Sequence, residues 1–254
     1  MYIIRFPKKK GGQSMKIIKD LLTINEYSRP GLKLNKVQGV VVHWVANPNT
    51  SAKANRNFFE NRRNGKSGYG SAHYIIDLDG SVILAIPPEE VAYHVGAESY
   101  RSEAVKRLGT YPNGTTLGIE CTHVDWNGKM TSETYETLVL LCADLCKKYN
   151  LNPLTDLYRH YDITGKLCHK WFVDHPTEWE TFKQKVKEQM GGNMDKIAAN
   201  KEQVKFNLLG KNYSFEGLIK DGKTYVTARD LLEALGFTVG WEAQSKTVIV
   251  KKKD

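Results

Sequence analysis

Short apolar runs rich in β-branched residues recur along the first 160 residues, separated by glycine, asparagine and proline. The valine run at residues 40–42 is too short for a helix, so it predicts a buried strand that ends near His43. Asp79-Gly80 lies between two such runs and predicts an antiparallel hairpin, because both turn positions tolerate positive φ. The strands expected in this way cover residues 38–45, 72–77, 81–86, 116–122 and 157–161.

Helical periodicity predicts two helices in the later part of this region. From Thr131 to Tyr149 apolar residues recur at i, i+3, i+4 and i+7, a spacing that places Cys142 and Cys146 in a core. Another helix is expected from Thr177, and its inner face consists of Trp179, Phe182 and Val186.

A third helix is expected between the strand that ends near His43 and Gly65. Asn49 or Thr50 is expected to cap its first turn, and a left-handed glycine commonly ends a helix. Its inward residues are expected to be Ala54, Phe58 and Phe59, and its outward residues Arg56, Arg62 and Arg63. Because strands and helices alternate, the pattern predicts an α/β fold in which helices flank a mixed central β-sheet.

The sequence changes character at residues 190–193, where two glycines interrupt the last of these helices. Thr227 and Asp230 then form the cap of a further helix, which Gly236 ends. The remaining pattern predicts a small α+β domain with strands near residues 204–209, 213–219, 224–226 and 247–250. The expected organisation is a flexible leader (1–14), a larger domain (15–190), a linker (191–194) and a small domain (195–254).

The net charge of +9 is concentrated toward the two ends of the chain. Residues 1–14 carry four basic and no acidic groups, and residues 195–254 carry 11 basic and 8 acidic groups. The region between them carries 22 basic and 20 acidic groups, so we expect no basic groove for nucleic acid there. No apolar run approaches the roughly 18 residues of a membrane span, and no secretory signal is recognised at the N-terminus.

The four cysteines and seven histidines indicate where chemistry is to be sought. All histidines lie between His43 and His175, and without a secretory signal the cysteines favour metal ligation or packing over disulfides. His160 and Cys168 are eight residues apart with a glycine turn between them, and His43 lies at a strand end. Imidazole and thiolate are zinc ligands, and three protein ligands with one open position are typical of catalytic zinc.

Four segments resemble the zinc N-acetylmuramoyl-L-alanine amidases of bacteriophage and bacterial autolysins, which are related to peptidoglycan recognition proteins. In sequence order they are VVVHW at residues 40–44, SAHYIID at 71–77, LGIE at 117–120 and HYDITGKLC at 160–168. The resemblance covers about residues 15–189. It implies His43, His160 and Cys168 as ligands of one Zn²⁺, Glu120 as general base, Lys166 as the cation facing the developing oxyanion, and His73 and His94 as substrate contacts.

Physical alternatives stand beside several of these roles. Glu120 and its neighbour Cys121 point to opposite faces of a strand, so Cys121 is expected in the core. Lys166 is either a catalytic cation or a solvated lysine, and Asp162 either orients a ligand or closes the turn before Gly165. Residues without motif support, expected to be structural or exposed, are His123, His169 and His175.

Two positions depart from the family pattern. His169 stands where many relatives have proline, which leaves a spare potential ligand beside Cys168. Ala72 stands where some relatives have tyrosine, which disfavours a tyrosine-assisted mechanism and strengthens Glu120 as the base.

Residues 221–241 resemble the small N-terminal module first named from copper amine oxidases. Residues 195–254 contain no histidine or cysteine, so copper chemistry is not implied. In a wall hydrolase this region is expected to be a cell-wall-targeting domain. Its aromatic residues, either sugar or polymer contacts or the module's own core, are Tyr213, Tyr225 and Trp241.

These observations together predict a zinc hydrolase that cleaves the amide bond between N-acetylmuramic acid and L-alanine in peptidoglycan. Without a signal peptide the enzyme is expected to be made in the bacterial cytoplasm as a phage or prophage endolysin, which reaches the wall through a separate pore or on lysis. A host autolysin is one alternative. A non-catalytic peptidoglycan-binding protein is another, although such receptors typically lack the cysteine ligand present here as Cys168.

Overall fold

The computed structural model describes residues 3–5, 15–191, 202–208, 210–220, 223–242 and 247–253. The chain divides into two compact units, Met1–Met190 and Gly191–Asp254. Among the described residues no helix combines the length and apolarity that crossing a bilayer requires. Apart from Gly191, the expected linker lies outside the described residues.

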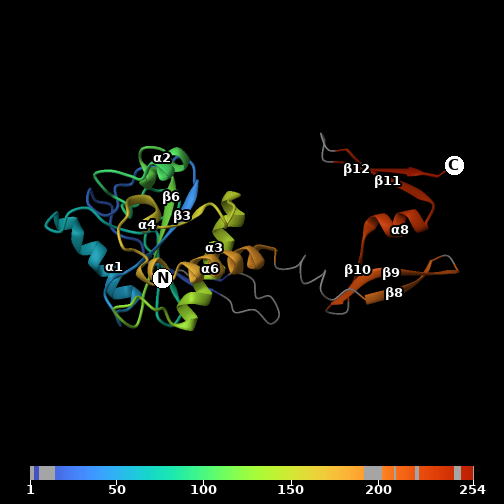
Figure 1. Cartoon of the computed structure of the whole chain (residues 1–254), viewed down its shortest axis with the longest axis horizontal. Coiled ribbons are helices and arrows are strands. Elements are labelled where there is room, and N and C mark those ends of the chain that lie inside the picture. Colours follow the sequence, from blue (N-terminus) through green and yellow to red (C-terminus); the bar gives the residue numbers. More distant parts are fainter. Residues whose placement is uncertain are drawn as a thin grey trace. The chain divides into compact units, whose positions relative to one another are not determined.

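The first unit is built on a seven-stranded mixed sheet with the order β1-β2-β5-β4-β6-β3-β7 (Figure 1). Strands β4, β6, β3 and β7 run parallel, whereas β5 is antiparallel to β4 and parallel to β2. The five strands expected from the sequence are all present in shortened form, and the mixed sheet is confirmed. The strands are Ile3–Arg5 (β1), Lys16–Lys19 (β2), Gly39–Trp44 (β3), Tyr74–Ile76 (β4), Val82–Leu84 (β5), Thr116–Cys121 (β6) and Leu157–Arg159 (β7).

Helices cover both faces of this sheet, as alternating residues of β3 show. Val40 and Val42 pack in one core cluster with residues of α3 and α6, while Val41 packs in another with residues of α2 and α4. Figure 1 shows α1 and α3 on opposite sides of the central strands. The helices are Ala52–Asn61 (α1), Ser102–Leu108 (α2), Ser132–Tyr149 (α3), His160–Thr164 (α4), Lys170–Asp174 (α5) and Pro176–Gly191 (α6), with 3₁₀ turns Arg62–Asn64 (η1) and Pro112–Gly114 (η2).

The cap and inner face of α1 differ from the sequence prediction. Ser51, not Asn49 or Thr50, is the N-cap, and its side chain accepts a hydrogen bond from the Ala54 amide. The buried residues of the helix are Ala52, Asn55, Arg56 and Phe59. Phe58, predicted to be inward, is 53% exposed.

Hydrogen bonding to distant residues explains why Arg56 of α1 is buried. Its guanidinium donates to the carbonyl oxygens of Asp20 and Leu21 and pairs with the carboxylates of Asp20 and Glu60. A guanidinium can be buried when its donors are hydrogen-bonded. Because Arg56 is buried, the inner face of α1 differs from the face that the apolar residues alone predict.

The N-terminal segment also differs from the prediction of a leader outside the fold. Ile3–Arg5 form the edge strand β1, which pairs antiparallel with β2. The other residues of the predicted leader lie outside the described residues. Strand β2 and helices α2 and α5, each of seven residues or fewer, were not predicted from the sequence.

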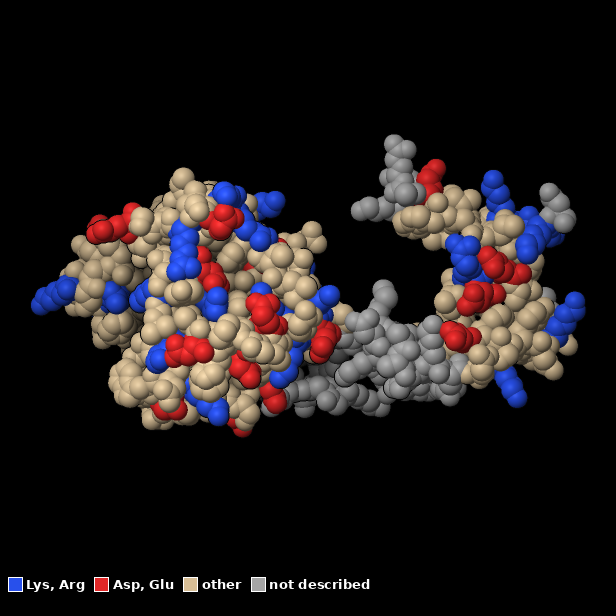
Figure 2. Space-filling view, in the orientation of Figure 1, with Lys and Arg blue, Asp and Glu red and all other residues tan. Residues whose placement is uncertain are grey.

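Basic and acidic side chains are interspersed over the face of the first unit that Figure 2 shows. Ion pairs between residues close in sequence occur in the described part of the first unit, such as Lys106 with Glu103 and Lys183 with Glu180. Part of the positive charge of this unit is therefore locally paired.

The second unit contains a three-stranded antiparallel sheet in the order β10-β9-β8 and a two-stranded ribbon of β11 and β12. Thr227 caps the helix between them and accepts a hydrogen bond from the Asp230 amide, as predicted. Tyr225 and Trp241 are 48% and 59% exposed, and Tyr213 is half-buried. The elements are Glu202–Leu208 (β8), Lys211–Lys220 (β9), Lys223–Val226 (β10), Ala228–Ala234 (α8), Phe237–Glu242 (β11, not predicted) and Thr247–Lys252 (β12).

Candidate metal centre

Three potential metal ligands from distant parts of the sequence meet near the end of strand β3. The ligand atoms of His43, His160 and Cys168 lie within 4.8 Å of one another, and all three residues are buried. Cys168 Sγ is 3.6 Å from His43 Nδ1. Zinc bonds of about 2.3 Å to sulfur and 2.0 Å to nitrogen, meeting at a tetrahedral angle, separate the two atoms by about 3.5 Å. The pair is therefore spaced as two ligands of one ion require.

Helix α4 holds His160 beside Cys168, where the sequence predicted a strand that runs into a loop. The strand ends at Arg159, and Gly165 ends the helix in the left-handed conformation. The Tyr161 amide donates a 2.7 Å hydrogen bond to the Cys168 carbonyl, which ties the start of the helix to the cysteine. This backbone hydrogen bond thus keeps His160 and Cys168 close to each other.

Asp162 caps the N-terminus of α4. Its carboxylate accepts hydrogen bonds from the Arg159 amide (2.8 Å) and from the Arg159 guanidinium (2.6 Å). The guanidinium also donates to the Phe172 carbonyl on α5. Asp162 therefore acts on the segment that carries His160, and its described bonds include neither a ligand ring nor the turn before Gly165.

The surroundings of this group favour the neutral form of both histidines. The thiolate form of Cys168 requires a cation nearby. Burial lowers the pKa of His160 to about 4 and that of His43 well below its usual value, and the Lys166 charge adds to both shifts. Burial raises the pKa of the Cys168 thiol, and the nearby Glu120 carboxylate raises it further. Neutral imidazoles are ready to bind a metal, and a divalent ion compensates the thiolate that burial disfavours. The donor set therefore fits zinc.

Glu120 lies beside this group on the same face of the sheet. It pairs directly with His43 across the parallel strands β6 and β3, so the two side chains project the same way. Its Oε2 atom is buried and has no hydrogen-bond partner among the described residues. Burial raises the pKa of Glu120 to about 8, opposed by the Lys166 charge. A carboxyl with one buried, unpaired oxygen and such a pKa is suited to proton transfer near neutral pH.

Lys166 is solvated, and its charge still acts on the candidate metal ligands and on Glu120. The residue is exposed to solvent, yet its charge lowers the pKa values of His43, Glu120, His160 and Cys168. One ammonium group therefore lies within electrostatic reach of all three ligands and the carboxyl.

The two histidines expected to contact substrate have both ring nitrogens engaged within the chain. The ring of His73 bonds the Gly118 amide at 3.0 Å and the Glu90 carbonyl at 2.9 Å. His94 Nδ1 is 3.1 Å from His43 Nε2, and its Nε2 is 3.3 Å from the Thr116 carbonyl oxygen. Neither ring has a nitrogen without a partner in the chain, and contact with substrate stays a prediction for both residues. The glycine at residue 118 was the sequence feature that marks this close packing.

The remaining histidines lie outside the ligand group. The His123 ring accepts from the Asn47 amide and bonds the Asp125 carbonyl. His169, the spare potential ligand, is buried and packs on Phe172. His175 is exposed and stacks on Trp171. The core cysteines, which lie in the large cluster as predicted, are Cys121, Cys142 and Cys146.

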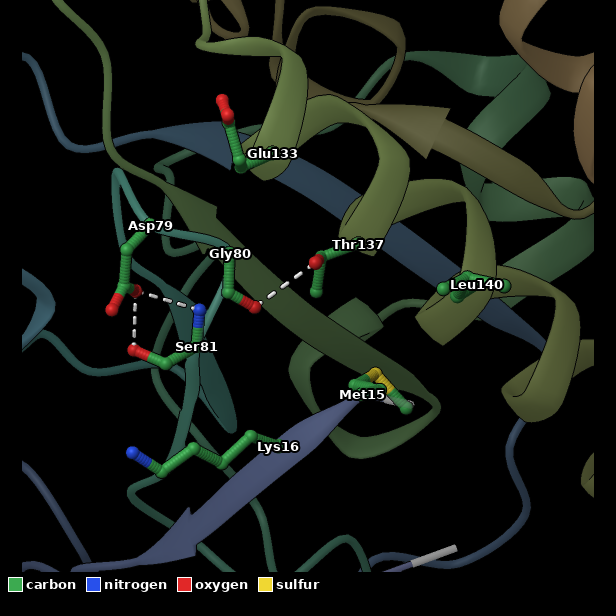
Figure 3. Close-up of a pocket in the computed structure, with 8 residues that line it drawn as sticks. All are labelled: Met15, Lys16, Asp79, Gly80, Ser81, Glu133, Thr137 and Leu140. Carbon is green, nitrogen blue, oxygen red and sulfur yellow. Dashed lines mark hydrogen bonds between the residues drawn. The ribbon is translucent and has the colours of Figure 1, made fainter. Parts of the chain in front are cut away.

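A small pocket of about 130 Å³ lies away from the ligand group, between the β4–β5 turn and helix α3 (Figure 3). The Thr137 hydroxyl donates to the Gly80 carbonyl, and the Ser81 amide and hydroxyl donate to Asp79. The Thr137 bond joins the hairpin to α3, and the two Ser81 bonds close the turn itself, so all three have a structural role. The lining residues, none of them in the ligand group, are Met15, Lys16, Asp79, Gly80, Ser81, Glu133, Thr137 and Leu140.

Residues 33–171 match the family model described as N-acetylmuramoyl-L-alanine amidase. The matched segment contains all three ligands, Glu120 and Lys166 and makes up more than half of the chain. The chain belongs to this amidase family. Residues 205–254 match a second model, described as copper amine oxidase N-terminal domain.

Two curated relatives carry the amidase name. A probable N-acetylmuramoyl-L-alanine amidase of Bacillus licheniformis is 36% identical over 185 residues, which cover 73% of this chain and 51% of the relative. The amidase BlyA of Bacillus subtilis is 36% identical over 178 residues, which cover 67% of this chain and 47% of that protein. The chain thus spans about half the length of the curated relatives it matches.

Solved structures support the fold of the first unit. The catalytic domain of PlyG aligns with a TM-score of 0.55 at 21% identity, over 69% of this chain and 96% of that domain. The catalytic domain of XlyA aligns with a TM-score of 0.52 at 22% identity, over 67% of this chain and 98% of that one. The first unit therefore has the fold of an amidase catalytic domain.

Proposed function

We propose that the first unit is a zinc hydrolase that cleaves the amide bond between the lactyl group of N-acetylmuramic acid and L-alanine in bacterial peptidoglycan. The observation that carries the proposal is the meeting of His43, His160 and Cys168 beside Glu120, whose buried Oε2 has no hydrogen-bond partner among the described residues. Family membership supports the same bond as the target. The setting we propose is cell-wall lysis by an endolysin.

His43, His160 and Cys168 would hold a zinc ion, which would supply Lewis acidity toward the scissile carbonyl and a water molecule. Glu120, in its ionised form, accepts a proton from the attacking water and passes it to the leaving amine. The Lys166 charge lowers the pKa of this carboxyl against the effect of burial and so favours the ionised form. The ammonium of Lys166 stabilises negative charge that develops on the carbonyl oxygen.

The competing function is recognition of peptidoglycan without cleavage. A receptor has no need for a metal-bound thiolate or for a buried carboxyl that lacks a partner. Retaining an unpaired carboxyl costs stability, so its presence beside three metal ligands favours catalysis.

Product analysis of digested cell walls tests this function. We expect new amino termini on L-alanine and no new reducing sugars, because only the amide bond is cleaved. The measurement is amino-terminal labelling alongside a reducing-sugar assay of the same digest. New reducing ends would indicate a glycosidase, and the absence of both products from walls that the protein binds would favour the receptor.

We propose that residues 195–254 hold the enzyme on the wall polymer. Exposed Tyr225 and Trp241 support this role, because aromatic faces left in water commonly contact ligands. A fragment of residues 1–190, which retains every proposed catalytic group, should cleave soluble muropeptide at the full-length rate and whole walls more slowly. Rates of both proteins on both substrates check this. Equal losses on the two substrates would assign the second unit a stabilising role, and no loss on either would contradict targeting.

A further inference from the structure

The ring of His43, a proposed metal ligand, contacts a second histidine on the side away from Cys168. Its Nδ1 faces Cys168 Sγ at 3.6 Å, and its Nε2 lies 3.1 Å from Nδ1 of His94. Both rings are buried and cross nearly at right angles, at 88°. Only one of the two facing nitrogens can carry the hydrogen of this bond, so the contact couples the protonation patterns of the two rings.

The partners of each ring determine the direction of the hydrogen bonds. If Nδ1 of His43 is the ligand atom, its lone pair is unprotonated and Nε2 carries the hydrogen, which it donates to His94 Nδ1. His94 then carries its own hydrogen on Nε2, which lies 3.3 Å from the Thr116 carbonyl oxygen, an obligate acceptor. The Thr116 hydroxyl, 3.2 Å from the same nitrogen, donates to the Pro112 carbonyl and is therefore free to accept. Each ring therefore donates to the next group in the order His43, His94, Thr116.

The position of the His94 ring is built into the fold. Asn113 Oδ1 accepts hydrogen bonds from the backbone amides of His94 (3.0 Å) and Val95 (2.9 Å). Under the ring is Gly118, where a Cβ atom would lie 2.5 Å from His94 Cγ. Any side chain at residue 118 would displace the ring from His43, so the glycine in β6 is required for this contact.

We propose that His94 is a positioning residue for the metal centre, which accepts the Nε2 hydrogen of His43 and so holds the Nδ1 lone pair toward the metal. The inference rests on the proposed zinc site and assigns His94 a role that differs from contact with substrate. Outer hydrogen bonds of this kind fix the tautomer and orientation of a ligating imidazole.

Zinc affinity of His94 variants tests the proposal in the full-length protein. Competition with a chromophoric chelator should show 10- to 100-fold weaker zinc binding for His94→Leu, as is typical when an outer partner of a metal ligand is lost. His94→Asn should bind close to wild type, because its Oδ1 occupies about the position of the imidazole Nδ1 and accepts the same hydrogen. His94→Gln, equally polar but longer, should resemble His94→Leu. The absorption spectrum of the Co²⁺-substituted proteins should change for Leu and Gln and be preserved for Asn.

The matched control is His73→Leu. His73 is another buried histidine, and both of its ring nitrogens bond backbone groups. This variant should lower the thermal stability of the metal-free protein without weakening zinc binding. Equal zinc affinity of wild type and His94→Leu would overturn the proposal, as would equal weakening by Leu and Asn. A wild-type protein that binds no zinc would instead refute the metal site itself. If His94→Leu does not fold, the comparison of Asn with Gln still decides.

Discussion

Cys168→Ser should abolish wall hydrolysis and zinc binding together. An alcohol oxygen is a far poorer zinc ligand than a thiolate, and the remaining pair, His43 and His160, is too small a donor set to retain the ion. The loss of affinity should exceed the 10- to 100-fold that an outer hydrogen bond contributes. Bound zinc and turnover, measured on the same sample, check this. Chelation of the wild-type protein should likewise remove activity, and added Zn²⁺ should restore it.

Cys121→Ser provides the matched control. Cys121 follows Glu120 directly on β6, but its side chain lies in the core on the opposite face of the sheet. The serine buries a hydroxyl and should lower the melting temperature while leaving zinc content unchanged. Full activity in a Cys168→Ser protein shown to be free of metal would contradict the zinc mechanism.

Glu120→Gln should lose on the order of 10²- to 10⁴-fold in turnover while retaining zinc. The amide has almost the shape of the carboxyl but cannot accept a proton from water. The measurement pairs initial rates on soluble muropeptide with zinc content. Loss of the metal from this variant would show that Glu120 is a ligand, and unchanged turnover would remove it from the mechanism.

Glu120→Gln also tests whether the Glu120 carboxyl is shielded from water. The test compares how the free energy of unfolding of the variant and of the wild type depends on pH. Burial raises the pKa of Glu120 to about 8, so the folded metal-free protein binds this proton more tightly than the unfolded chain does. Its stability contribution is therefore complete below the usual glutamate pKa and is lost as pH rises toward 8. Relative to Glu120→Gln, the metal-free wild type should lose up to about 1.4 kcal/mol per pH unit across that window. Parallel stability curves would show that the carboxyl is solvated.

Hydrophobic pattern predicted most of the elements that build the site. The valine run of β3 and the motif before Glu120 were identified as strands because they are β-branched, short and bounded by turn residues. In the second unit, the cap at Thr227 was located from local chemistry alone, since capping involves residues three positions apart. Short elements such as α4 were missed because five residues are too few to display a helical period.

The inner face of α1 was misjudged for a different reason. Periodicity counts apolar residues, and it assigned Arg56 to solvent. The guanidinium instead satisfies carbonyl groups about 35 residues away in sequence, contacts that only the folded chain creates. Hydrogen bonds at such separations leave no mark on local composition.

The sequence by itself determined the mixed α/β architecture and which residue types could carry the chemistry. It placed His43 and Glu120 near strand ends and set His160 and Cys168 one short turn apart. Only the tertiary structure decided that parallel pairing of β3 and β6 brings His43 and Glu120 side by side. It also decided that the ring of His94 contacts the ring of His43. Strand order and ring-to-ring contacts depend on packing between segments distant in sequence, and the period of a single segment carries no information about its neighbours.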